Sequence, residues 1–217
     1  MGKTTSTVQE SHLQHHFVDA DQQFESSKLG MWIFLVTEVL MFGGLFVAYI
    51  IYRSWHPELF YLAAKELDTL LGATNTVVLI ASSLTIALAI RAVQTDRIQA
   101  AINYMGATIV LAATFMVIKY FEYSDKFAKG ILPGAAYHYD GIAHDMAANF
   151  FSIYYMMTGL HGIHVIIGMA LIAWMMVKAK RGNVHSGYYT PVENTGLFWH
   201  LVDIIWIFLF PLLYLID

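Results

Sequence analysis

The stretch LGMWIFLVTEVLMFGGLFVAYIIY, residues 29–52, determines the fold class, because its 24 residues include a single charged side chain, Glu38. A helix of this length reaches about 36 Å, which is enough to cross a hydrocarbon core of about 30 Å. Glu38 then lies about 13 Å along the axis, where an ionised carboxylate costs about 2.5–3.5 kcal/mol or more. An acid at this depth is a candidate functional residue.

The composition of the whole chain also indicates an integral membrane protein. Hydrophobic residues make up 58% of the 217 and charged residues 13%, whereas a soluble domain carries about 25% charged residues. The net charge of −4 argues against a nucleic-acid partner. The chain contains no cysteine, which excludes disulfides, thiolate metal sites and iron–sulfur clusters.

Four further apolar segments follow the first one. The sequence therefore predicts an all-α fold, an integral membrane five-transmembrane-helix bundle with spans at about residues 29–52, 69–92, 98–120, 146–177 and 194–216. Residues 29–217 form one membrane domain in this interpretation, and residues 1–28 form a polar tail without the apolar core of a signal peptide. The longest connection, residues 121–145, is expected to be irregular because glycine and proline interrupt it.

The distribution of lysine and arginine predicts the orientation. The tail and the second and fourth connections share one side and hold Lys3, Lys28, Arg91, Arg97, Lys178, Lys180 and Arg181. The first and third connections hold Arg53, Lys65, Lys119, Lys126 and Lys129. Because positive loops stay in the cytoplasm, this asymmetry predicts a cytoplasmic N-terminus and an external C-terminus.

Two pairs of polar residues lie inside the later spans. His161 and His164 are three positions apart, as are His200 and Asp203, so each pair shares a helix face. Histidines with a carboxylate can bind a metal, and a His–Asp pair can share a proton. We expect instead that His161 and His164 hydrogen-bond to neighbouring helices or lipid headgroups, and that His200–Asp203 forms an interhelical polar contact. For Glu38 two interpretations stay open: a structural, hydrogen-bonded or protonated acid, or an acid that tunes proton movement or lipid binding.

These segments resemble subunit III of the haem–copper cytochrome c oxidases. WIFLVTEVLMFGGLFVAY is similar to the family's first shared helix, with Glu38 at the position of its membrane-embedded, carbodiimide-reactive glutamate. Four more motifs occur in the family's order: LGATNTVVLIASS with Asn75 and Thr76, KYFEYSDKF with Glu122 and Tyr123, HGIHVIIG with His161 and His164, and WHLVDIIWIFLFPLLYL with Trp199, His200 and Asp203. Five motifs in this order and spacing are highly specific.

The resemblance departs from the mitochondrial pattern at one point. The chain lacks the first two of the family's seven helices, as many bacterial members do. Those two helices form one arm of a V-shaped, lipid-filled cleft, so another subunit is expected to supply the missing surface.

The resemblance implies a supporting function inside a respiratory enzyme. No catalytic or metal-binding residue is expected in this chain, because haem and copper belong to partner subunits of the family's complexes. The implied direct partner is oxidase subunit I, beside subunits II and IV and membrane phospholipid. Such a subunit III sustains proton uptake by subunit I in the bacterial inner (plasma) membrane. Asn75, Glu122, His161, His164, Trp199, His200 and Asp203 are then structural polar or lipid-contact positions.

Other functions stay open at this stage. The chain is also compatible with subunit III of a quinol oxidase, or with the accessory subunit of a nitric oxide reductase system. A proton-coupled transporter that uses Glu38 and His200–Asp203 as a relay belongs to a different class. The sequence shows neither an internal repeat nor matching interrupted helices, which many such transporters carry.

Overall fold

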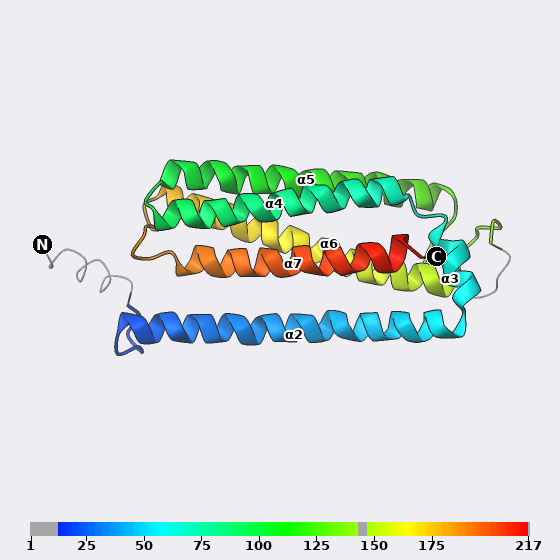
Figure 1. The fold of residues 1–217 in the computed structure, drawn as a ribbon, viewed down its shortest axis with the longest axis horizontal. Helices are drawn as coiled ribbons and strands as arrows, with labels where there is room; N and C mark the ends of the chain where they lie inside the picture. Colours follow the sequence, from blue (N-terminus) through cyan, green and yellow to red (C-terminus); the bar gives the residue numbers. More distant parts are fainter. Residues whose placement is uncertain (1–12, 143–146, 217) are drawn as a thin grey trace, which may run out of the picture.

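The computed structural model describes residues 13–142 and 147–216 and confirms the predicted all-α membrane bundle. Five of the helices in these ranges are long and apolar enough to cross a membrane: α2 (Ala20–Trp55), α4 (Thr69–Gln94), α5 (Ile98–Ala128), α6 (Ala147–Lys180) and α7 (Thr190–Tyr214). The described ranges contain no β-strand. The described chain begins at one end of the bundle and finishes at the other (Figure 1).

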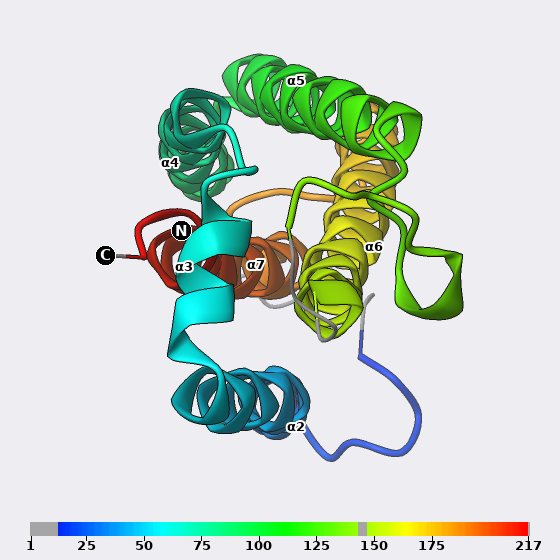
Figure 2. The same cartoon turned by 90° about the vertical axis from the view of Figure 1, so that its right-hand side faces the viewer.

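The helices form a group of four and an outlying one. Helices α4, α5, α6 and α7 pack around one another, whereas α2 lies beside α6 and α7 and away from α4 and α5 (Figure 2). Only 17% of the apolar window of α2 is buried, against 50% for α7. Much of α2 therefore faces lipid or a partner.

The connection between the first two spans is more ordered than its polar sequence predicts. It contains a short helix, α3 (Pro57–Ala64), that buries Leu59 and Phe60. The Phe60 ring packs edge-on against Tyr49 of α2 and Phe150 of α6, with centroids 5.3 and 5.0 Å apart. The Tyr49 hydroxyl donates to the Leu212 carbonyl oxygen of α7. These contacts attach α2 to the other helices at this end.

Several helices extend beyond the predicted spans. Helix α2 begins at Ala20 because Asp19 caps it: the Asp19 carboxylate accepts a hydrogen bond from the Gln22 backbone N–H at 2.7 Å. Helix α5 continues through residues 121–128, which the sequence analysis placed in an irregular connection. Helix α7 begins at Thr190 rather than at residue 194. Residue 146, the predicted start of the fourth span, lies outside the described ranges.

Glycine permits the closest contacts between helices. A Cβ atom on Gly168 of α6 would lie 2.6 Å from the Trp199 ring of α7. A Cβ atom on Gly72 of α4 would lie 2.7 Å from Phe210 of the same helix α7. Since membrane helices associate largely through close packing, these two glycines help to place α7 between α4 and α6.

Candidate functional site

The structure pairs Glu38 of α2 with His164 of α6. The Glu38 Oε2 atom lies 2.9 Å from His164 Nε2, and both side chains are largely buried, with 14% and 11% of their surface exposed. The rings of Phe42 and Phe198 pack beside the imidazole at centroid distances of 5.3 and 6.2 Å. The deep acid of the first span is therefore bound to one of the histidines of the fourth span.

The second nitrogen of His164 determines how many protons this pair holds. His164 Nδ1 lies 2.8 Å from the Leu160 carbonyl oxygen, which can only accept, so Nδ1 carries a hydrogen. The contact between His164 Nε2 and Glu38 then needs exactly one further proton, because two lone pairs would otherwise face each other. With that proton on either atom, the pair has no net charge. A neutral pair avoids most of the cost of burying a carboxylate in the membrane.

A second buried cluster surrounds Glu122 of α5. The Glu122 carboxylate accepts hydrogen bonds from Lys119 Nζ (2.9 Å), Lys126 Nζ (3.0 Å), the Tyr154 hydroxyl (2.8 Å) and the Tyr214 hydroxyl (2.6 Å). Lys119 Nζ also donates to the Tyr214 hydroxyl at 2.6 Å. Glu122 is 3% exposed and Lys126 2% exposed, so the cluster joins α5, α6 and α7 inside the bundle.

Sequence reasoning found Glu122 but missed its partners. The prediction that Lys119 and Lys126 are charges of the third connection is wrong, since both are buried side chains of α5. A signal for their position was available: Lys119, Glu122 and Lys126 are spaced i, i+3 and i+7, so they lie on one helix face. The roles of Tyr154 and Tyr214 had no comparable signal, because each is one of several aromatic residues in its own span.

The two histidines of α6 have different surroundings. His161 is fully buried between the rings of Phe115 and Trp206, at centroid distances of 5.5 and 5.3 Å. Neither of its ring nitrogens has a hydrogen-bond partner among the described residues. The expected hydrogen bond to a neighbouring helix is thus found for His164 and not for His161.

Of the His200–Asp203 pair, which was expected to form an interhelical polar contact, His200 contacts another helix. His200 Nδ1 lies 2.7 Å from the Ser83 hydroxyl of α4. Ser83 also lies near the Asp203 carboxyl group, but neither carboxyl oxygen has a hydrogen-bond partner at normal distance in the part of the chain described. Of these two residues, His200 therefore makes the hydrogen bond to α4.

Two other predicted polar positions, Trp199 and Asn75, are also buried. The Trp199 indole N–H donates to the Ser82 hydroxyl at 3.0 Å. Asn75 is fully buried, and its amide has no hydrogen-bond partner within the described ranges. Those ranges also contain no group of three or more His, Asp or Glu side chains placed to hold a metal ion.

Comparison with known proteins decides the family. The family described as cytochrome c oxidase subunit III matches residues 5–217. The chain belongs to the cytochrome c oxidase subunit III family. The buried contacts of Glu38, Glu122 and His200 are therefore features of a subunit III chain.

Individual relatives agree with this assignment. A protein of Thermostichus vulcanus named cytochrome c oxidase subunit 3 is 34% identical over 194 residues, covering 87% of this chain and 86% of the relative. A protein of Aeropyrum pernix named heme-copper oxidase subunit I+III is 29% identical over 197 residues, or 86% of this chain and 22% of that longer protein. A cytochrome bo(3) ubiquinol oxidase subunit 3 of Buchnera aphidicola is 27% identical, covering 98% of this chain and 96% of the relative.

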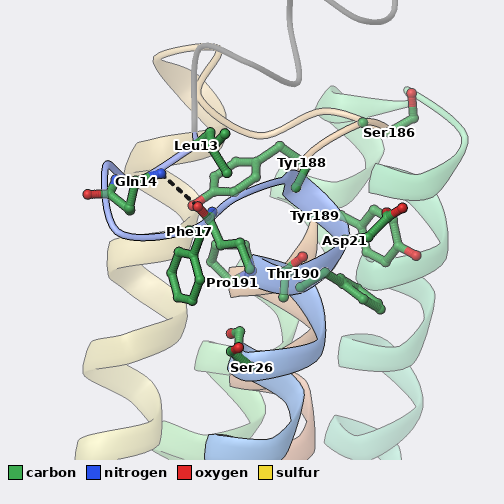
Figure 3. A pocket seen from close by; sticks show the side chains of 15 residues that line it. Leu13, Gln14, Phe17, Asp21, Ser26, Ser186, Tyr188, Tyr189, Thr190 and Pro191 are labelled. Carbon is green, nitrogen blue, oxygen red and sulfur yellow. Dashed lines mark hydrogen bonds between the residues drawn. The ribbon is translucent and has the colours of Figure 1, made fainter.

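A surface pocket of about 570 Å³ lies at the N-terminal end of this subunit III chain (Figure 3). Residues 13–27 face the connection between α6 and α7 across it, and Gln14 and Tyr188 lie on its two sides. Lys28 Nζ lies 2.7 Å from Glu193 Oε1 and holds the start of α2 against α7. None of the predicted site residues lines this pocket, so it is separate from the buried contacts of the bundle.

Proposed function

We propose that the chain is the non-catalytic subunit III of a proton-pumping haem–copper terminal oxidase. The observation that carries the proposal is the family match over residues 5–217. In this assignment subunit I is the direct partner, and the haem and copper groups are held by partner subunits. The Aeropyrum pernix relative supports the partnership, because its name assigns subunits I and III to one polypeptide.

The electron donor of the complex is proposed to be cytochrome c. Relatives named as cytochrome c oxidase subunits include the Thermostichus vulcanus protein at 34% identity. The Buchnera aphidicola relative, at 27% identity, supports a second candidate, subunit III of a quinol oxidase. The two candidates share the role of this chain and differ in the molecule that donates electrons to the complex.

The buried contacts suggest how such a subunit would serve subunit I. We propose that the Glu38–His164 pair supports proton uptake by holding an acid and an imidazole in hydrogen-bond contact inside the membrane. The Glu122 cluster and the Ser83–His200 contact hold α4, α5, α6 and α7 in one arrangement. A rigid four-helix surface is what a stabilising subunit needs to present to subunit I.

The proposed location is the bacterial plasma membrane, with the N-terminus in the cytoplasm. Because Lys119 and Lys126 are buried in α5, they are no longer counted among the positive charges of the external loops. Arg53, Lys65 and Lys129 then stand against the seven cationic residues of the other side. The charge asymmetry that supports this orientation is therefore larger than the sequence count suggested.

Purification through a tag on this chain tests the proposal. The chain should be extracted from its own cells in mild detergent, with an untagged strain as the control. We expect a haem–copper subunit I to co-purify together with oxidase activity.

A copper A absorbance band would support cytochrome c as the donor, and its absence would support quinol. Recovery of the chain without any haem protein would contradict the subunit assignment. Proton-coupled uptake by liposomes that contain only this chain would favour a transporter instead.

A further inference from the structure

One ring nitrogen of His200 lies at the surface of the bundle without a hydrogen bond. His200 Nδ1 is bound to the Ser83 hydroxyl of α4 at 2.7 Å, whereas Nε2 has no hydrogen-bond partner among the described residues. The side chain is only half-buried, and Nε2 is not enclosed by protein as the two ring nitrogens of His161 are. A molecule outside the chain can therefore reach this atom.

The depth of His200 makes an unpaired nitrogen costly. The residue lies ten positions after the start of α7 at Thr190, which is about 15 Å along the helix. It lies fourteen positions, or about 21 Å, before the end of α7 at Tyr214. The middle of the membrane offers no hydrogen bond to a group that faces lipid.

Exposed hydroxyl groups of the spans avoid this cost within their own helices. Thr37, Thr74 and Thr114 each donate to a backbone carbonyl oxygen three or four residues earlier, at 2.6, 2.8 and 3.0 Å. The imidazole of His200 uses its inner nitrogen for α4, so its outer nitrogen has no such local solution. We therefore expect a polar group of another molecule to bind it.

Apolar side chains surround His200 on the outside of α4 and α7. Ile204 and Ile207 follow His200 by four and seven positions, and Ile80 precedes Ser83 by three, so they share the sides of these two residues. All three isoleucines are exposed. We call these five residues the His200 face. Figure 2 shows α4 and α7 on one side of the four-helix group and α6 on the other.

A transmembrane helix fits the His200 face better than lipid does. Lipid headgroups lie at the membrane surface, far from the depth of His200, and acyl chains carry no hydrogen-bonding group. A helix of a partner can pack against the exposed isoleucines and also supply one polar side chain at the required depth. Polar side chains that hydrogen-bond across an interface are a common attachment between membrane helices.

We propose that the His200 face docks a transmembrane helix of subunit I, and that a polar side chain of this helix hydrogen-bonds to His200 Nε2. The identity of the partner rests on the proposed function, and the docking surface and its polar contact go beyond it. The Ser83 hydroxyl holds the ring by Nδ1, which leaves Nε2 for the partner.

Photocrosslinking in the purified complex tests which side of the chain contacts subunit I. A benzophenone amino acid replaces Ile80 or Ile204 in the His200 face, and Val110 of α5 or Ile166 of α6 as matched controls. These side chains are 53%, 49%, 65% and 54% exposed, so all four probes start from accessible positions. We expect crosslinks to subunit I, identified by mass spectrometry, from Ile80 and Ile204 and none from the two controls.

Two variants of His200 separate its nitrogens. The amide of His200→Asn can reach the position of Nδ1 and keep the bond to Ser83, whereas the amide of His200→Gln can reach the position of Nε2. We expect the ratio of dissociated to bound chain, at a fixed detergent concentration, to rise about tenfold in His200→Asn. This corresponds to about 1.4 kcal/mol. His200→Gln should stay within about twofold of the unchanged chain.

Several results would overturn the docking surface while the subunit assignment stands. They are crosslinks to subunit I from Val110 or Ile166 as strong as those from Ile80 and Ile204, crosslinks from the His200 face to lipid alone or to a second copy of this chain, and unchanged retention of His200→Asn in the complex. If His200→Asn fails to fold, the crosslinking variants decide alone. A purified complex without any haem–copper subunit would instead contradict the proposed function.

Discussion

His164 Nε2 on α6 lies 2.9 Å from Glu38 Oε2 on α2, and the other ring nitrogen, Nδ1, is hydrogen-bonded to the Leu160 carbonyl oxygen. Two residues 126 positions apart are thus joined by a hydrogen bond between α2 and α6. Because α2 has few other contacts along its middle, this pair is one of the attachments that hold it to the bundle.

Replacing Glu38 by a polar residue should retain the stability of the chain, and replacing it by an apolar residue should lower it. In Glu38→Gln the amide can donate to the neutral His164 ring, so we expect assembly and thermal stability to be retained. In Glu38→Leu the buried ring nitrogen loses its partner, and we expect a loss of about 1–3 kcal/mol. Unfolding of the purified chain in mixed micelles measures both, with the exposed Val36→Leu as the control. Equal stability of the two Glu38 variants would contradict a stabilising hydrogen bond between Glu38 and His164.

Glu122 should be the most sensitive member of the buried charge cluster. Glu122→Gln leaves Lys119 and Lys126 facing each other without a carboxylate, and removing one partner of a buried ion pair costs about 3–5 kcal/mol. A triple replacement of Lys119, Glu122 and Lys126 by methionine removes all three charges and should be milder. The hydroxyls of Tyr154 and Tyr214 remain 3.3 Å apart and can bond to each other. Titration with denaturing detergent compares the variants, and a triple variant less stable than Glu122→Gln would refute this account.

The sequence was sufficient to predict the architecture because membrane spans depend on local composition. Long apolar segments with few charges locate all five helices, and lipid leaves the backbone little choice but a helix. The ends of the helices depended on other features. Helix α5 continues past residue 120 because the polar residues Glu122 and Lys126 satisfy each other inside the protein, which a hydropathy count cannot register.

The sites were harder to predict, because helix faces can be inferred from spacing but pairs across helices cannot. The spacing places His161 and His164 on one face of the same helix, α6. Only the structure shows that His164 contacts Glu38 and that His161 packs against two aromatic rings. His200 and Asp203 share a helix face as predicted, but His200 binds a serine of α4. The rotation of each helix within the bundle determines these partners.

The contact of α6 with α7 should not tolerate even a methyl group at Gly168. The added Cβ atom would lie 2.6 Å from the Trp199 ring, which is buried and held by its hydrogen bond to Ser82. Overpacking of this kind costs about 1–3 kcal/mol, so Gly168→Ala should lower the midpoint of thermal unfolding. Gly106→Ala is the matched control, since its Cβ atom has open space. A melting temperature equal to that of the control would mean that Trp199 can move aside freely.

The link between Ser83 and His200 should appear as an energetic coupling. Each single alanine variant leaves the other side chain of the 2.7 Å contact without its partner. The double variant removes both side chains. Its loss of unfolding free energy should therefore be smaller than the sum of the two single losses, with a coupling energy of about 0.5 kcal/mol or more. A double-mutant cycle on the unfolding free energy measures this value. Strict additivity would show that the contact contributes nothing to the packing of α4 on α7.

The connection between α4 and α5 should loosen in acid because of Asp96. The Asp96 carboxylate accepts hydrogen bonds from the Ser186 backbone N–H at 2.8 Å and from its hydroxyl at 2.7 Å. These bonds, aided by the nearby His185, hold the pKa of Asp96 below its ordinary value of 3.8. A lowered pKa in the folded state means that the contact is fully present above the ordinary value and is lost as the pH falls through the lowered one. Hydrogen exchange at the Ser186 amide, corrected for the intrinsic rate, should therefore show strong protection at about pH 5 and lose it progressively as the pH is lowered below the ordinary value of 3.8. Asp96→Asn cannot titrate, so its protection should not change over the same pH range, and an equal loss of protection in this variant would assign the change to another group.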